Sequence, residues 1–199
     1  MKSILSMASG ILFLVSFLPY IRGILRGETK SSKASWIIWA SLDTISLCGM
    51  YAKGTLNGQI IGAVLGAWVV VALALRYGVS GWTKLDVICL IGAVLGIFLW
   101  WLSNEPTVGI LTSAIVVVLG SFPTFVTAWR NPLHENKVAW TIMFISCICA
   151  LIAVPQWTLA DAAQPVAFTI VETTMIFLLW IRPRFKIQVE ALISAPAES

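Results

Sequence analysis

Long apolar runs are the feature that most limits what this chain can fold into. Five runs carry no charged residue, and two more each hold a single acid. They lie at residues 4–21, 34–52, 56–75, 87–104, 106–129, 138–160 and 162–181. An apolar run of about 18 residues or more is long enough to span a hydrocarbon core about 30 Å thick. Because 59% of the residues are hydrophobic and 11% are charged, the sequence predicts an integral, multi-pass membrane protein with seven transmembrane helices in the lipid bilayer.

The basic residues between these runs predict the orientation. Eleven of the 13 Lys and Arg residues lie after the first, third and fifth runs or in the C-terminal tail: Arg22, Arg26, Lys30, Lys33, Arg76, Lys84, Arg130, Lys137, Arg182, Arg184 and Lys186. Lys2 and Lys53 lie on the other side. The positive-inside rule therefore predicts an outside N-terminus and a cytoplasmic C-terminus, in a plasma membrane or bacterial inner membrane. The net charge of +4 is explained by topology and gives no reason to expect a nucleic-acid partner.

Two stretches of the chain align at a constant offset of 104 residues. The shared positions are Pro19, Arg26, Lys33 and Trp36 in the first stretch and Pro123, Arg130, Lys137 and Trp140 in the second. This repeat predicts that residues 3–76 superpose on about 107–180. Because three crossings reverse the side of the chain, a fourth helix is needed to give both bundles the same orientation. The bundles are then parallel and related by a pseudo-two-fold axis along the membrane normal.

A proline, a short basic loop and a second helix that begins with Ser and Trp resemble the PQ-loop superfamily, which includes the SWEET and SemiSWEET (MtN3) sugar transporters. The resemblance covers roughly residues 11–76 and 115–180, and Tyr20 and Thr124 replace the glutamine of the motif. It implies an all-α membrane protein with seven transmembrane helices, arranged as two parallel three-helix bundles joined by a linker helix (3+1+3). The predicted domains are a first bundle at 1–80, a linker helix at 81–105, a second bundle at 106–184 and a cytoplasmic tail at 185–199.

The two matched prolines are candidate hinges. A proline inside a helix removes a backbone donor and clashes with the preceding turn, so the chain can bend there. The PQ-loop resemblance implies an inner gate at Pro19 and Pro123. The alternative is that each proline merely ends a helix before its loop.

Asp43 and Glu172 are the two acids inside the predicted spans. Each lies nine residues from the cytoplasmic edge of its run, which corresponds to a depth of about 13–14 Å. A carboxylate near the bilayer centre costs about 2.5–3.5 kcal/mol on the insertion scale, so such residues usually face a protein interior or a water-filled cavity. We predict that both acids bind substrate or carry a coupling proton. The structural alternative is a protonated acid that only hydrogen-bonds a neighbouring helix.

Residues around the acids complete the predicted substrate site. Trp39 shares a helical face with Asp43, and Thr173 adjoins Glu172. Trp68 lies 104 residues before Glu172, and the PQ-loop resemblance implies ligand contacts on the third helix of each bundle. The predicted binding set is Trp39, Asp43, Trp68, Glu172 and Thr173, which could stack a flat part of a ligand and hold a polar or cationic end. Trp36 and Trp140, at span ends, are interpreted as interfacial anchors.

Three classes of function are compatible with this pattern. The repeat and the intramembrane acids favour a transporter of a small polar metabolite, such as a sugar, amino acid, amine or vitamin-like solute, that works by alternating access with or without proton coupling. A ligand-binding receptor or sorting protein on the same fold is the alternative. An enzyme is disfavoured because no nucleophile has a partnering base. The single His134 and the scattered cysteines predict neither a metal site nor a cofactor. The sequence leaves the oligomeric state open, and a homo-oligomer is compatible with it.

Overall fold

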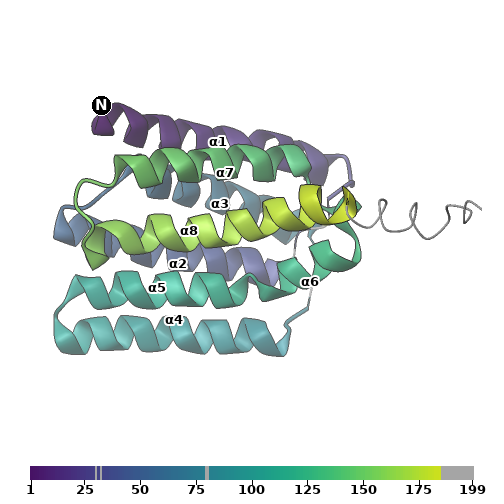
Figure 1. Cartoon of the computed structure of the whole chain (residues 1–199). Coiled ribbons are helices and arrows are strands. Elements are labelled where there is room, and N and C mark those ends of the chain that lie inside the picture. The colour runs from purple at the N-terminus through teal and green to yellow at the C-terminus, as the bar shows by residue number, and fades with distance from the viewer. Residues whose placement is uncertain (30, 32, 79–80, 185–199) are drawn as a thin grey trace, which may run out of the picture.

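The computed structural model describes residues 1–29, 31, 33–78 and 81–184, which form a bundle of helices lying side by side (Figure 1). The α-helices are α1 (Lys2–Leu25), α2 (Lys33–Lys53), α3 (Gly58–Tyr77), α4 (Lys84–Ser103), α5 (Pro106–Gly120), α6 (Phe122–Arg130), α7 (Lys137–Ala153) and α8 (Leu159–Ile176). A short 3-10 helix, η1 (Pro132–His134), precedes α7, and a π-helical segment, η2 (Phe177–Ile181), extends α8. The predicted tail, residues 185–199, lies outside the described residues.

The lengths and compositions of these helices fit a membrane protein. Five helical segments are long and apolar enough to cross a bilayer: Lys2–Leu25, Gly58–Tyr77, Asp86–Ser103, Pro106–Arg130 and Leu159–Arg184. α7 is apolar but shorter, and α2 is less apolar because it holds Asp43 and several serines. Counted with α5 and α6 as one span, the described residues form seven long helical segments. The chain is therefore an all-helical multi-pass membrane protein, and the predicted helix count is confirmed.

Side-chain caps explain where several helices begin. The first turn of a helix has backbone N–H groups without intrahelical partners, and Asn, Ser, Thr and Asp side chains can accept from them. Asn57 accepts from the backbone of Ile60 at the start of α3, and Asn136 accepts from Ala139 at the start of α7. Thr83 and Asp86 form a reciprocal capping box at the start of α4. Local sequence thus explains where these helices start.

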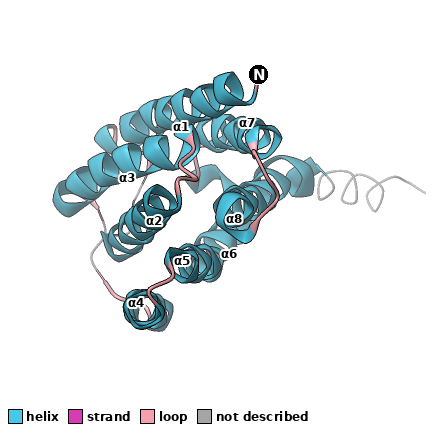
Figure 2. Cartoon of the chain, turned by 90° about the vertical axis from the view of Figure 1, so that its left-hand side faces the viewer, coloured by secondary structure: helices cyan, strands magenta, loops and turns pink. Residues whose placement is uncertain are grey.

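We define two sets of helices by their order in the chain: α1, α2 and α3 are the first set, and α5, α7 and α8 are the second. In the first set α3 packs against both α1 and α2, and in the second α8 packs against both α5 and α7. The sets meet where α1 packs against α7 and where α2 packs against α5. α4 packs mainly on α5 and lies at the edge of the molecule when the bundle is viewed along its helices (Figure 2).

The two ends of the bundle differ in charge. We call the end that holds the C-terminus of α1 and the start of α2 the basic face, and the other end the opposite face. Basic residues described at the basic face are Arg22, Arg26, Lys33, Arg76, Lys84, Arg130, Lys137, Arg182 and Arg184. Within the described residues, Lys2 and Lys53 are the basic residues of the opposite face. Lys30 and Lys186 lie outside the described residues.

Glycines bring α1 and α3 close together. A Cβ atom built on Gly62 would lie 2.4 Å from the Gly10 carbonyl oxygen, and one on Gly58 would lie 2.1 Å from the Ser6 carbonyl oxygen. Small residues at four-residue spacing allow such close backbone approach in membrane helices. This contact fixes α3 against α1 and leaves the other side of α3 to face the centre of the bundle.

Candidate functional site between the helix sets

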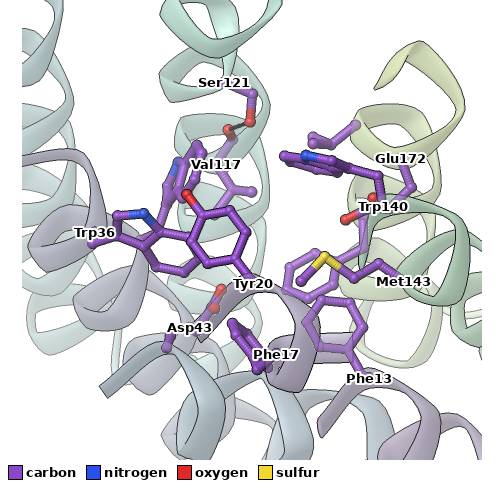
Figure 3. Close-up of a pocket in the computed structure, with 14 residues that line it drawn as sticks. Phe13, Phe17, Tyr20, Trp36, Asp43, Val117, Ser121, Trp140, Met143 and Glu172 are labelled. Atoms are coloured by element: carbon purple, nitrogen blue, oxygen red, sulfur yellow. Dashed lines mark hydrogen bonds between the residues drawn. The ribbon is translucent and has the colours of Figure 1, made fainter. Parts of the chain in front are cut away.

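A small cavity lies between the two sets of helices (Figure 3). All helices of both sets line it, whereas α4 contributes no residue. The lining residues are Phe13, Phe17, Tyr20, Trp36, Trp39, Asp43, Ala67, Val117, Ser121, Trp140, Met143, Phe168, Val171 and Glu172. The space open to the centre of a water molecule is about 70 Å³. This is well below the roughly 300–1,000 Å³ of typical ligand pockets, so the cavity is contracted in this structure.

Aromatic rings form a continuous part of the cavity wall. Phe13 contacts Phe17 with ring centroids 5.8 Å apart and Phe168 at 5.5 Å. The chain of rings continues to Trp36, which lies 5.2 Å from Tyr20 and 5.3 Å from Trp39. Such tilted and edge-on arrangements are the favourable geometries for aromatic pairs. The wall therefore presents large, rigid, weakly polar surfaces to any occupant.

Asp43 and Glu172 lie in the same cavity, on opposite sides of it (Figure 3). Asp43 comes from α2 and is 7% exposed, and Glu172 comes from α8 and is 4% exposed. The Glu172 Oε2 atom has no hydrogen-bond partner among the described residues. No Lys, Arg or His belongs to the lining residues. The structure thus brings together two acids that are 129 positions apart in the chain and gives neither a basic partner in the cavity wall.

Trp39 also lines the cavity, but Trp68 and Thr173 do not. Trp68 is 45% exposed on the outer surface of α3, and its indole N–H donates to Thr44 Oγ1 at 3.1 Å. Thr173 is exposed. Successive residues of a helix are rotated by about 100°, so Ala67 faces the cavity and Trp68 faces away. Trp68 and Thr173 therefore lie outside the lining of this cavity, although the sequence placed them in the predicted binding set.

The two candidate hinge prolines differ in their local structure. α1 continues through Pro19 to Leu25, and the Pro19 carbonyl accepts from Asn136 Nδ2 at 3.0 Å. Pro123 stands at the start of α6, directly after the helix is interrupted at Ser121. Neither proline ends its helix before the loop. The helix is interrupted next to Pro123, whereas it continues unbroken through Pro19.

A polar network joins the helices on the side of the cavity that faces the opposite face. Gln59 Nε2 donates to Cys147 Sγ at 3.2 Å and lies 3.4 Å from Ser146 Oγ. Gln164 Nε2 donates to Gln59 Oε1 at 3.1 Å, and Asn57 Nδ2 donates to Gln164 Oε1 at 2.9 Å. Gln59 and Gln164 are buried. The network therefore joins α3 of the first set to α7 and α8 of the second, one turn from Phe168.

A second, wider cavity lies beyond this network, at the opposite face. Its volume open to the centre of a water molecule is about 400 Å³, and its lining includes Lys2, Asn57 and Asp161. Asn57 belongs both to this lining and to the network. The network thus adjoins this second cavity, which we call the vestibule, and lies between it and the central cavity along α3 and α8.

The repeat offset accounts for most of the central cavity wall. Ten of its 14 lining residues form five pairs separated by 104 positions: Phe13 with Val117, Phe17 with Ser121, Trp36 with Trp140, Trp39 with Met143, and Ala67 with Val171. Trp36 and Trp140, interpreted from sequence as anchors, are buried in this wall. Met143 lies 104 positions after Trp39, so applying the repeat offset to Trp39 would have predicted Met143 as a lining residue. Gln59 and Gln164 follow no such offset and gave no signal in the sequence.

Comparison with protein-family models, with curated proteins and with solved structures gave no match. Among the described residues, no group of three or more His, Cys, Asp or Glu side chains is arranged to hold a metal ion. The cavity can therefore be described by its own chemistry: two acids without basic partners, several aromatic faces and few other polar groups.

Proposed function

We propose that this chain is a membrane transporter of a small solute, in which two repeated three-helix bundles alternate access to a cavity between them. The first bundle is α1–α3, the second is α5–α8, and α4 is the linker. The helix bounds support the repeat. α2 and α7 begin at Lys33 and Lys137, and α1 begins at Lys2 where α5 begins at Pro106. Both pairs are separated by 104 residues.

The packing order supports a two-fold relation between the bundles. The offset pairs α1 with α5–α6, α2 with α7, and α3 with α8. A two-fold axis would replace each helix by its partner, so the contact of α1 with α7 should have a counterpart in a contact of α5 with α2. Both contacts are present. Parallel repeats related by an axis along the membrane normal are an established way to build a transporter, with its site between the repeats. This arrangement also agrees with the resemblance to the PQ-loop superfamily.

The observation that carries the proposal is the cavity wall itself. Five pairs of lining residues, one member from each bundle, stand at the repeat offset. A cavity that merely resulted from imperfect packing has no reason to follow the repeat. The shared wall is what a solute pathway along a pseudo-two-fold axis requires.

The small size of the central cavity fits one state of an alternating cycle. The Gln59–Gln164 network lies between the central cavity and the vestibule along the helices. Toward the basic face, the buried rings of Tyr20, Trp36 and Trp140 line the cavity. Because the cavity is too small for a metabolite, solute entry requires the bundles to separate at one end. The positive-inside rule places the basic face in the cytoplasm, so the network is the closure on the outer side.

Cysteine accessibility tests the proposal without knowledge of the solute. The four native cysteines, Cys48, Cys89, Cys147 and Cys149, are replaced by alanine, and Val117→Cys is introduced as a reporter in the cavity wall. A membrane-impermeant maleimide is then added to either side of the membrane. Alternating access predicts labelling from both sides. Labelling from one side alone would contradict transport and favour the receptor alternative.

A cross-link sharpens this test. Asn57→Cys and Gln164→Cys replace two residues that are hydrogen-bonded across the bundles, and an oxidised pair should block labelling from the opposite face while permitting it from the basic face. The matched control is Thr44→Cys with Trp68→Cys, which joins two hydrogen-bonded residues within the first bundle. The control cross-link should leave labelling from both sides intact, and a reductant should reverse the block.

A further inference from the structure

The charge of the central cavity limits what it can hold. Asp43 and Glu172 enter it from different bundles, on opposite sides (Figure 3). Burying a polar group without a partner is costly, and burying an unpaired charge is more so. The Glu172 Oε2 atom is buried and has no partner, and its residue is more than nine-tenths buried. An occupant of the cavity is therefore the natural source of the missing interaction.

Among the described residues, the elements around the two acids place no counter-charge in the cavity lining. α1 contributes Tyr20 as its titratable group, and α3 and α5 contribute Ala67, Val117 and Ser121. α7 contributes Cys147, whose thiol is close enough to interact with Glu172. Each carboxyl group can then be stabilised in one of two ways, by its own proton or by a cation from outside.

The rest of the wall favours a cation that carries an apolar part. The faces of Trp36, Trp39 and Tyr20 can attract a cation by cation–π interaction and can pack against a flat or apolar group. A polyhydroxylated solute would need many hydrogen-bond partners, because each unpaired polar group left in such a site lowers affinity. Ser121 Oγ already donates to the Val117 carbonyl, and the wall offers few other such groups. An anion would meet two acids and no basic side chain.

We propose that the solute of this cavity is an organic monocation with an aromatic or flat apolar part, and that its binding displaces a proton from Asp43 or Glu172. This inference rests on the proposed transport function and names its substrate class. On binding, a carboxyl O–H bond breaks, the proton passes to water, and the carboxylate pairs with the cation. The charge of the cavity does not change. When the cation leaves on the other side of the membrane, a proton returns to the carboxylate, so one proton is exchanged for each cation.

The proposal is tested by calorimetric titration of the purified full chain with three probes of nearly the same size. These are phenethylammonium, neutral 2-phenylethanol and anionic phenylacetate. We expect phenethylammonium to bind at least tenfold more tightly than either of the others. Titration in two buffers with different ionisation enthalpies should show the release of about one proton per bound cation. Equal or tighter binding of the neutral or anionic probe would overturn the substrate class, and cation binding without proton release would overturn the exchange.

Amide variants locate the interaction. Glu172→Gln and Asp43→Asn keep the shape of each side chain but cannot pair a cation by charge. At least one of them should weaken phenethylammonium binding tenfold or more and abolish its proton release. The control on the same helix is Thr174→Val, because Thr174 bonds only within α8, to Ile170, and lies outside the cavity lining. Thermal unfolding of each variant separates loss of binding from loss of folding. Unchanged cation binding by the folded double amide variant would overturn the proposal.

The accessibility experiment distinguishes this inference from the transport function on which it rests. If Val117→Cys is labelled from both sides but the cation does not bind, the substrate class is wrong and transport stands. If the cation binds but labelling occurs from one side alone, transport fails and the cavity is a cation receptor.

Discussion

The two bundles share the starts of their first two helices, at an offset of 104 residues, but differ in how tightly their outer helices pack. In the first bundle, Gly10, Gly58 and Gly62 bring α1 against α3. Residues 104 positions later are Ala114, Ala162 and Val166. These three residues line a groove of about 490 Å³ between α5 and α8. The proposed repeat preserves the order of the helices, whereas the residue size at the contact differs between the two bundles.

The bundles also differ in continuity and in the position of their acids. α1 is unbroken, whereas its counterpart is interrupted between α5 and α6. The first bundle carries its cavity acid on its second helix, as Asp43, and the second bundle carries Glu172 on its third. The two proposed repeats therefore differ in their chemistry. The first is tightly packed with an unbroken first helix, and the second has a groove between α5 and α8 and an interrupted first helix.

The largest effect should come from filling the tight contact of the first bundle. Gly62→Val places there the residue found at the matching position of the second bundle. Overpacking costs about 1–3 kcal/mol, and the obstacle here is the backbone of Gly10. One kcal/mol shifts the unfolding midpoint of a protein of this size by about 2–4 °C, so we expect a fall of about 5 °C or more, measured by thermal unfolding in detergent. Val166→Ala should change the midpoint much less. Equal shifts would mean that the two bundles do not differ in packing.

The second prediction concerns the interrupted helix. In Pro123→Ala the restored N–H can bond within the helix and reduce the interruption at Ser121. We expect labelling of the Val117→Cys reporter to slow several-fold. Pro19→Ala, in the unbroken helix, should change the rate less than twofold. A stronger effect at Pro19 would place the hinge in the first bundle.

A third prediction separates two residues at the same repeat position, Trp68 and Glu172. Trp68→Phe removes a hydrogen bond at the outer surface of α3. Because Trp68 lies outside the cavity lining, its loss should leave the affinity for phenethylammonium unchanged within about twofold, since a change of 1.4 kcal/mol is needed for tenfold. A tenfold loss, measured by the same calorimetric titration, would return Trp68 to the binding site predicted from sequence.

The smallest effect should appear in the loops that precede the second helix of each bundle. Glu135 stands where the first bundle has the uncharged Ser31. Burial raises the pKa of Glu135, although the N–H that Trp140 donates to its Oε2 at 2.9 Å opposes that rise. A raised folded pKa means that Glu135 favours folding less as the pH rises above the ordinary value of about 4.3 and through the folded pKa. Glu135→Gln should therefore unfold at a slightly higher temperature than the wild type at pH 7. The difference should vanish near pH 4. If the difference in unfolding temperature between the variant and the wild type did not change with pH, its cause would be packing and not the titration of Glu135.

The sequence by itself determined the helical segments and their number. Apolar runs of sufficient length have few alternatives to helices in a bilayer, because every backbone polar group must be satisfied there. Caps such as Asn57 and Asn136 fixed helix starts. The acids were also accessible to sequence reasoning, since the cost of exposing Asp43 or Glu172 to lipid predicts an interior position.

Only the tertiary structure decided which neighbours of those residues face the cavity. A rotation of about 100° per residue separates Ala67 from Trp68, and the close contact of α3 with α1 selects between them. Gln59 and Gln164 meet across 105 positions of the chain, and a polar residue near a helix start looks the same in sequence whether it faces water or closes a cavity. Packing between helices that are distant in the chain therefore decided which residues line the site. The local sequence pattern determines that a segment is helical, but it does not determine the rotation of that helix about its own axis.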